Sequence, residues 1–280
     1  MGVLTNRAIS IARSAFYRLT EPHKLKNARL DNLDGWAGVW DRGDPLVSVI
    51  IPTHERIELL TERALASVFA QTYRRVEVLI CAHGSPDHWV NVTQAATDIR
   101  RWGHGGMPRR VICVPRVPKY PPTAENHWFA GPVDPINAGL KWASGKWIAR
   151  IDDDDEWHPR HIERLLRFAQ QYNYEFVSSA YETPNGIKAH DGESIPIGGV
   201  QTWLYRGYLK FMRANPHCYL KRRNRVNDTD LADRFRKAGV RIGHFADATA
   251  RVFPRPGETV IGLKAYQQNR AETERKLAFK

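Results

Sequence analysis

Residues 136–159 read INAGLKWASGKWIARIDDDDEWHP, and this stretch decides the fold. Helical spacing over 137–143 predicts a helix that stops at Gly145, because glycine disfavours continuation of a helix. Residues 147–151 predict a short buried strand, which runs directly into four aspartates at 152–155. A helix followed at once by a buried strand belongs to a βαβ unit, the element from which parallel sheets are built.

The sequence before this stretch supplies more elements of the same kind. Apolar runs predict buried strands at 47–52, 76–81 and 111–115, and helices are predicted over 60–69 and 88–102. Alternating strands and helices form right-handed crossovers, and ligands bind outside the carboxyl ends of the strands. Polar clusters follow three of the strands, at 53–56, 83–85 and 152–155. We therefore expect an α/β protein in which these clusters meet in one crevice.

The second half of the chain has a less regular pattern. Helices are predicted over 159–172 and 231–238, with a strand at 176–179 and a glycine- and proline-rich loop or hairpin at 182–200. Residues 264–280 predict a polar, partly exposed helix.

The composition favours anionic partners. The chain has 42 Lys and Arg against 30 Asp and Glu, a formal net charge of +12. Nucleotide phosphates, nucleic acid and an anionic membrane surface would all suit this charge. We expect no specific nucleic-acid binding, because zinc-finger spacing, RNP-type aromatic pairs and heptad-bearing basic helices are absent from the sequence.

Other patterns indicate the compartment. No apolar run approaches the roughly 18–20 residues of a membrane span, and residues 1–20 lack the features of a signal peptide. The three cysteines, Cys81, Cys113 and Cys218, form no CxxC pair. We expect them to be reduced thiols of a cytoplasmic protein.

The first 30 residues carry a basic, amphipathic pattern. Apolar residues fall on one helical face, and arginines punctuate the stretch: Leu4, Ala8, Ala12, Ala15 and Leu19, with Arg7, Arg13 and Arg18. Two interpretations remain open. The helix lies on an anionic membrane surface, at the inner face, or it packs on its own domain.

The aspartate run indicates a cation. Hard divalent ions such as Mn²⁺ or Mg²⁺ prefer carboxylate oxygen, and Mg²⁺ usually takes one or two carboxylates together with phosphate oxygens. In an extended segment Asp152 and Asp154 point to the same side. A metal in a basic crevice would suit a diphosphate ligand. The alternative is a solvated acidic loop that caps the next helix.

Three segments together resemble one enzyme family: VSVIIPTHER at 47–56, ALASVFAQTYRRVEVLICAHGSPD at 64–87, and residues 136–159. They are similar to glycosyltransferase family 2, and a further patch lies near 226–239. The resemblance implies a GT-A-type, Rossmann-like, mostly parallel sheet with an N-terminal helical extension and an irregular C-terminal acceptor region. It also implies inverting, metal-dependent transfer from a nucleoside-diphosphate sugar to a hydroxyl of a glycan or lipid-linked saccharide.

The resemblance also implies roles for matching residues. Asp154, with Asp152, would bind Mn²⁺ or Mg²⁺, and Asp228 in the segment NDTDL at 227–231 would be the catalytic base. An N-cap on the following helix is the alternative role for Asp228. The candidate nucleotide-sugar-binding residues are Pro52, Thr53, Glu55, His83, Asp152, Asp153, Arg251 and Arg255, of which the two arginines lie in a segment that we expect to be a loop closing over the phosphates.

Two substitutions and one segment leave choices open. Ala82 and His83 stand where the family usually has two aspartates, so uridine, thymidine and guanosine donors all remain possible, and His83 either contacts the base or is a turn residue. Gln201, Thr202 and Trp203 are candidates for an acceptor wall, with a core tryptophan as the alternative.

These interpretations divide the chain into an N-terminal helix and linker (1–44), a nucleotide-sugar-binding half (45–158), an acceptor-binding half (159–263) and a C-terminal tail (264–280). Two other functions remain open. One is a sugar nucleotidyltransferase, although its glycine-rich N-terminal signature is absent, and the other is a non-catalytic nucleotide-sugar-binding protein. Polysaccharide assembly is the setting that the family suggests by analogy.

Overall fold

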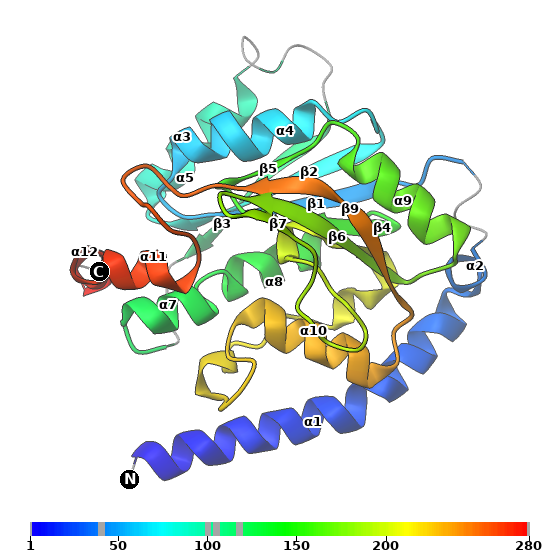
Figure 1. Cartoon of the computed structure of the whole chain (residues 1–280), viewed down its shortest axis with the longest axis horizontal. Coiled ribbons are helices and arrows are strands. Elements are labelled where there is room, and N and C mark those ends of the chain that lie inside the picture. The colour runs from blue at the N-terminus through cyan, green and yellow to red at the C-terminus, as the bar shows by residue number, and fades with distance from the viewer. Residues whose placement is uncertain (1, 39–42, 99–101, 103–106, 116–119, 279–280) are drawn as a thin grey trace.

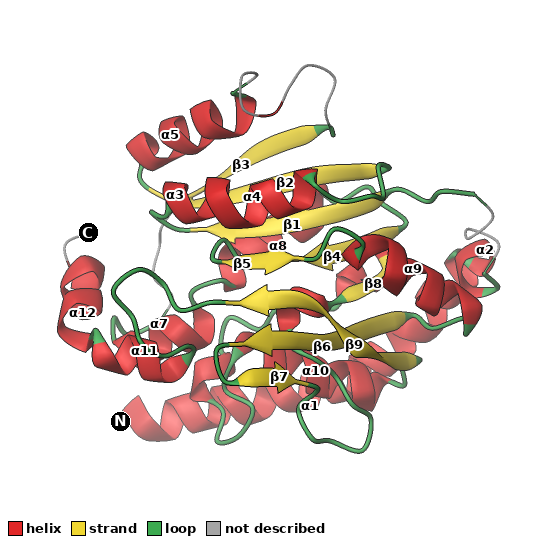
Figure 2. Ribbon diagram, turned by 45° about the horizontal axis from the view of Figure 1, so that its top comes forward, coloured by secondary structure: helices red, strands yellow, loops and turns green. Residues whose placement is uncertain are grey.

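The computed structural model describes residues 2–38, 43–98, 102, 107–115 and 120–278. Within these residues a nine-stranded sheet has the order β3-β2-β1-β4-β8-β6-β9-β5, and β7 pairs with β6 beside this path. In chain order the strands are β1 (Val47–Thr53), β2 (Val76–Gly84), β3 (Arg109–Pro115), β4 (Trp147–Arg150), β5 (Asp155–Trp157), β6 (Phe176–Thr183), β7 (Gly186–Lys188), β8 (Leu204–Arg206) and β9 (Ile242–Val252). Helices lie on both faces of the sheet, so the predicted α/β class is confirmed (Figure 2).

The strands predicted before residue 151 form the parallel part of the sheet. β1 pairs in parallel with both β2 and β4, and β2 pairs in parallel with β3. The other half is mixed, because β8 is antiparallel to β4 and β6, and β5 is antiparallel to β9. β8 reaches the sheet from a short 3-10 turn, not from a helical crossover, and a short connection of this kind permits an antiparallel strand.

The helices form two layers. They are α1 (Gly2–Asp31), α2 (Leu33–Trp36), α3 (Ile57–Leu59), α4 (Leu65–Phe69), α5 (Pro86–Thr97), α7 (Ala124–Ala130), α8 (Val133–Trp142), α9 (His161–Gln171), α10 (Asn227–Ala238), α11 (Leu263–Gln268) and α12 (Arg270–Ala278). A π-helical turn, η2 (Leu60–Ala64), joins α3 to α4, and the 3-10 turns are η3 (Val200–Thr202), η4 (Gly207–Phe211) and η5 (Cys218–Leu220).

Each face of the sheet has its own apolar core. Val49 and Ile51 of β1 pack among residues of α4, α5 and α9, whereas the intervening Ile50 packs among residues of α8, α10 and α1. The alternation follows from the two-residue period of a strand. Figure 1 shows α3, α4 and α9 above the sheet and α8, α10 and α1 below it.

Local signals explain several helix ends. The helix predicted over 88–102 begins at Pro86, because the Ser85 hydroxyl accepts a hydrogen bond from the His88 backbone N–H at 3.3 Å. This helix ends at Thr97, and residues 99–101 lie outside the described part of the chain. The helix predicted from 231 begins earlier, at Asn227, and ends before Gly239, which has a φ of 83°.

α1 packs on the domain through its second half only. Leu25 is 1% exposed within the core below the sheet, and the Arg29 guanidinium donates to the Glu175 carboxylate. The first half leaves Phe16 and Leu19 exposed to solvent. The side chains of Leu4 and Arg7, which belong to the predicted amphipathic pattern, lie outside the described part of the chain.

The structure can be compared with two sequence expectations, reduced cysteines and the lack of a membrane span. Cys81, Cys113 and Cys218 are free thiols. Among the described helices, none combines the length and the apolar composition that crossing a bilayer requires.

Candidate active site

A pocket of about 480 Å³ lies at the carboxyl ends of β1, β2 and β4. It brings together the three predicted polar clusters, represented by Thr53, His83 and the aspartates 152–155. The opposite walls come from α7, α10, α11 and the segment after β9. Convergence of strand ends that are distant in the sequence is what a parallel sheet with helical crossovers produces.

The aspartate run forms a turn and not the extended segment that we expected. The backbone N–H of Asp155 donates to the carbonyl of Asp152 at 3.2 Å, and β5 starts at Asp155. The chain turns here because β5 pairs antiparallel with β9, on the far side of the sheet. Asp152 and Asp154 both line the pocket despite this correction.

Arginines balance the charge of the aspartates. Arg56 Nη1 donates to Asp153 Oδ1 at 2.9 Å and to Asp154 Oδ2 at 3.1 Å. Arg150 pairs with Asp152 at 2.9 Å, and Arg255 Nε lies 3.8 Å from Asp154 Oδ2. The cations that the clustered carboxylates require are therefore supplied in part by the chain itself.

The four carboxylates differ in burial. Asp153 is 3% exposed, and its Oδ2 accepts a hydrogen bond from the Thr53 hydroxyl at 2.8 Å. Burial raises the pKa of Asp153 to about 6, against the opposing effect of Arg56. Burial also raises the pKa of Asp155 well above its usual range, and the neighbouring aspartates add to the shift. Asp152 and Asp154 have side chains that are 31% and 21% exposed, so they are the carboxylates that a ligand can reach.

These two carboxylates fit a divalent ion of the magnesium type. Within the described residues, no group of three or more His, Cys, Asp or Glu is arranged to hold an ion. Mg²⁺ commonly binds through one or two carboxylates and completes its coordination with phosphate oxygens and water. Asp154 and Asp152 present carboxylate oxygens at the surface of the pocket, which are donors of the kind that such an ion takes.

Asp228 lies on the pocket wall, in the first turn of α10. The N-cap of α10 is Val226, so the alternative role of Asp228 as the N-cap is wrong. Burial raises the pKa of Asp228, and Arg150 is the main opposing influence. A carboxylate whose pKa moves toward neutrality is better suited to accept a proton at physiological pH.

Arg150 connects the aspartate turn to α10. It is 6% exposed, and its guanidinium donates to Asp152 Oδ1 and, at 3.2 Å, to Asn227 Oδ1. The neighbour of Asp228 is thus held at a fixed place relative to the carboxylates at the end of β4. In the sequence, Arg150 could have been noticed as a charged residue inside the otherwise apolar strand at 147–151.

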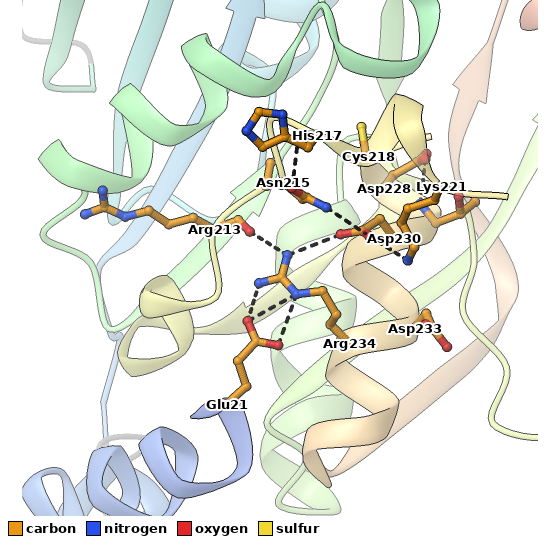
Figure 3. A network of polar contacts seen from close by, with 12 residues as sticks. Glu21, Arg213, Asn215, His217, Cys218, Lys221, Asp228, Asp230, Asp233 and Arg234 are labelled. Carbon is orange, nitrogen blue, oxygen red and sulfur yellow. Dashed lines mark hydrogen bonds and ion pairs between the residues drawn. The ribbon is translucent and has the colours of Figure 1, made fainter. Parts of the chain in front are cut away.

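A buried ion-pair network holds the other side of α10 (Figure 3). Arg234 binds the carboxylate of Glu21 on α1 and donates to Asp230 Oδ2 at 3.3 Å. Asp230 also receives Lys221 Nζ at 2.7 Å, and the carbonyl of Arg213 accepts from Arg234 at 2.8 Å. α10 is therefore fixed between the pocket and α1.

Several predicted site residues lie elsewhere. Trp203 is 3% exposed, and its indole N–H donates to the Gly198 carbonyl at 2.9 Å, so it is a core residue as the alternative stated. Thr202 is fully buried beside it, and Gln201 alone of the three lines the pocket. Arg251 belongs to β9 and not to the expected loop, because it continues the ladder and pairs with Glu182 at 2.6 Å.

Of the remaining nucleotide-binding candidates, four line the pocket and one does not. Pro52, Thr53, His83 and Arg255 line the pocket. Glu55 is exposed, has a φ of 55° and is not among the residues that line it.

The sequence gave little indication of some residues in the pocket. The Tyr266 hydroxyl accepts a hydrogen bond from Arg56 Nη2 at 3.3 Å, and its ring lies 4.4 Å from the guanidinium of Arg255. Tyr266 lies on α11, in the segment read as a polar tail. The rings of His54 and His127 are 5.8 Å apart in the same pocket, and no sequence motif joins them.

Comparison with known proteins assigns this site to a class. The model of the family described as "Glycosyl transferase family 2" matches residues 48–116 and 125–240, more than half of the chain. An uncharacterized glycosyltransferase of Rickettsia felis is 32% identical over 142 residues, which are 51% of this chain and 20% of that protein. The Escherichia coli protein named UDP-Glc:alpha-D-GlcNAc-diphosphoundecaprenol beta-1,3-glucosyltransferase WfaP is 26% identical over 49% of this chain and 46% of its own length. The chain thus spans between a fifth and about half of these relatives.

Solved structures show the same fold. Residues 1–349 of Staphylococcus aureus TarS in complex with UDP-GlcNAc superpose with a TM-score of 0.56 at 18% identity, covering 78% of this chain and 60% of that one. The mannosyltransferase PcManGT of Pyrobaculum calidifontis, in complex with GDP-Man and Mn²⁺, gives a TM-score of 0.55 at 18% identity, covering 90% and 70%.

Proposed function

The chain belongs to glycosyltransferase family 2, and we propose that it transfers a sugar from a nucleoside-diphosphate sugar to a hydroxyl acceptor with inversion at the anomeric carbon. One observation carries the proposal. The accessible carboxylates of Asp152 and Asp154 and the carboxylate of Asp228 line the same pocket, from opposite walls that Arg150 connects.

The donor would lie along the carboxyl ends of the parallel strands. Pro52, Thr53 and His83 are at the side of the pocket formed by β1 and β2, where a nucleoside would lie, and Arg255, which is 3.8 Å from Asp154, would contact the diphosphate. We propose that Asp154, with Asp152, holds Mn²⁺ or Mg²⁺. When bound there, the ion would balance the negative charge that develops on the departing diphosphate.

The reaction needs one proton acceptor. The acceptor hydroxyl oxygen attacks the anomeric carbon, the bond from that carbon to the diphosphate oxygen breaks, and Asp228 takes the hydroxyl proton. The raised pKa of Asp228 supports this role, and general-base assistance of this kind contributes roughly 10²–10⁴-fold in rate. Gln201 lies at the pocket wall and is the proposed contact for the acceptor.

The acceptor that we propose is a lipid-linked saccharide at the cytoplasmic face of a membrane. The name of WfaP, which gives a diphosphoundecaprenol acceptor and a UDP-glucose donor, supports this class of substrate. Donors carrying uridine, guanosine or thymidine are the candidates to compare, and solved structures similar to this chain carry UDP-GlcNAc or GDP-Man.

An assay of nucleotide products tests the proposal. Nucleoside diphosphates carrying common sugars are incubated with the chain and Mn²⁺, with and without saccharide acceptors. Release of nucleoside diphosphate supports transfer, whereas release of pyrophosphate in a parallel incubation with a nucleoside triphosphate and a sugar phosphate would indicate a nucleotidyltransferase. Donor binding without either product would indicate a non-catalytic binding protein.

Two variants test the assigned residues. Asp228→Asn should lower kcat at least roughly 100-fold while calorimetry finds donor affinity unchanged. The control is Asp233→Asn on the same helix, because Asp233 pairs with Lys237 and lies outside this pocket. Asp154→Ala should abolish the dependence of donor affinity on Mn²⁺, and unchanged metal-dependent affinity would reject its role as a ligand.

A further inference from the structure

The first half of α1 turns an apolar face toward solvent. Ile9, Phe16 and Leu19 are 37%, 52% and 73% exposed. The other side of the helix, which includes Ser10, Ile11 and Ser14, lines a groove of about 650 Å³ between α1 and α10. A helix that only packs on its domain turns its apolar face inward, so this exposed apolar face has a different partner.

The charges around this face are basic. The acidic residues of α1 are Glu21, which is buried against Arg234, and Asp31 at the C-terminal end. Exposed cations on the same helix include Arg18, Lys24 and Lys26. Across the groove, Arg222 and Arg223 are exposed cations, whereas Lys221 is paired with Asp230. An apolar face bordered by Lys and Arg is the composition of a helix that lies in the interface of an anionic bilayer.

We propose that the first half of α1 (residues 8–19) lies in the headgroup region of an anionic phospholipid bilayer, with Ile9, Phe16 and Leu19 inserted and the exposed cations of the helix near the lipid phosphates. α1 forms one side of the molecule, away from α5, so this orientation leaves the opposite side free (Figure 1). The contact is peripheral and reversible, because a single interfacial helix binds weakly.

This orientation gives the proposed lipid-linked acceptor a short route to the pocket, a step that rests on the proposed function. Residues 221–224 line the groove beside α1, and residues 226–229 line the pocket. One short segment therefore connects the groove beside the membrane-bound helix to Asp228. The ion pair between Glu21 and Arg234 holds α1 against the helix that carries Asp228.

Vesicle sedimentation tests the surface. The full chain is mixed with phosphatidylcholine vesicles, or with vesicles containing about 30% phosphatidylglycerol, at low and high salt. The wild-type chain should bind the anionic vesicles at least tenfold more tightly, and high salt should weaken this binding. Phe16→Gln with Leu19→Gln should reduce binding at least tenfold, because two apolar side chains no longer insert. Glutamine retains helix propensity, and circular dichroism checks that the fold persists.

The control is Val90→Gln, which removes a 54% exposed apolar side chain from α5 and should bind as the wild type does. Equal binding to both vesicle types, or a double variant that binds as the wild type does, would overturn the proposal. It would also fail if light scattering finds a wild-type dimer that the double variant converts to a monomer, since a second copy then covers α1. Donor hydrolysis in solution should be unchanged in the double variant, so an inactive chain that binds vesicles refutes the proposed function alone.

Discussion

Replacing Arg234 by methionine should destabilise the protein by about 3–5 kcal/mol, because the change leaves a buried carboxylate without its cation. Glu21 is 4% exposed, and Arg234 is the cation that contacts it within the described residues. Asp230 keeps Lys221 at 2.7 Å, so Glu21 bears most of the cost. The variant also loses the contact of the guanidinium with the Tyr17 ring, at 3.8 Å. For a chain of this size the cost lowers the melting temperature by roughly 10 °C.

Urea unfolding at pH 7 measures this cost. The matched control is Lys237→Met on the same helix, which breaks an exposed pair with Asp233 and should cost under about 0.5 kcal/mol. Adding Glu21→Leu to Arg234→Met should restore most of the lost stability, because neither charge is then buried. If Arg234→Met costs no more than the control does, the reasoning from a buried, desolvated network is refuted.

Three further changes test individual features. Burial lowers the pKa of His161 to about 3, so the neutral side chain stabilises the fold fully above pH 6.5, and this stabilisation is lost as the pH falls toward 3. The loss amounts to roughly 4–5 kcal/mol in the free energy of unfolding. His161→Phe should therefore weaken the fall in stability at acid pH, as measured by chemical unfolding. Gly139→Val should cost at least about 2 kcal/mol by thermal unfolding, because the first added carbon lies 2.6 Å from Ile50 Cγ2. Trp203→Phe should lower the free energy of unfolding by about 2 kcal/mol, because the Gly198 carbonyl loses its hydrogen-bond donor. The KM for the acceptor should be unchanged. A raised KM with normal stability would show that Trp203 contacts the acceptor.

The parallel half of the fold could be predicted because its signals are local. The apolar runs at 47–52, 76–81 and 147–151 and the helices between them follow from periodicity alone. Right-handed crossovers then bring the strand ends to one edge, so the meeting of Thr53, His83 and the aspartates also follows. The expected extended form of 152–155 was wrong because antiparallel pairing with a strand about 95 residues later turns the chain.

Residues whose roles depend on contacts between distant segments could not be predicted. Tyr266 enters the pocket because α11 packs against α7, and nothing near residue 266 indicates that packing. Arg251 was predicted to lie in a loop that closes over the phosphates, whereas β9 extends to Val252 and pairs with strands distant in the sequence. For α1 the amphipathic pattern itself could be read from the sequence. Which face of the helix is exposed could not be predicted, because it depends on which side lies against α10.

The pocket has one wall that lies beyond the last strand of the sheet. Arg255, Glu258 and Tyr266 all follow β9, and the nine strands are complete without them. Segments outside a sheet tolerate insertion and exchange better than the strands do. Substrate preference in this scaffold is therefore open to diversification by swapping a short stretch after β9, while the carboxylates proposed to hold the metal and the hydrophobic cores stay untouched.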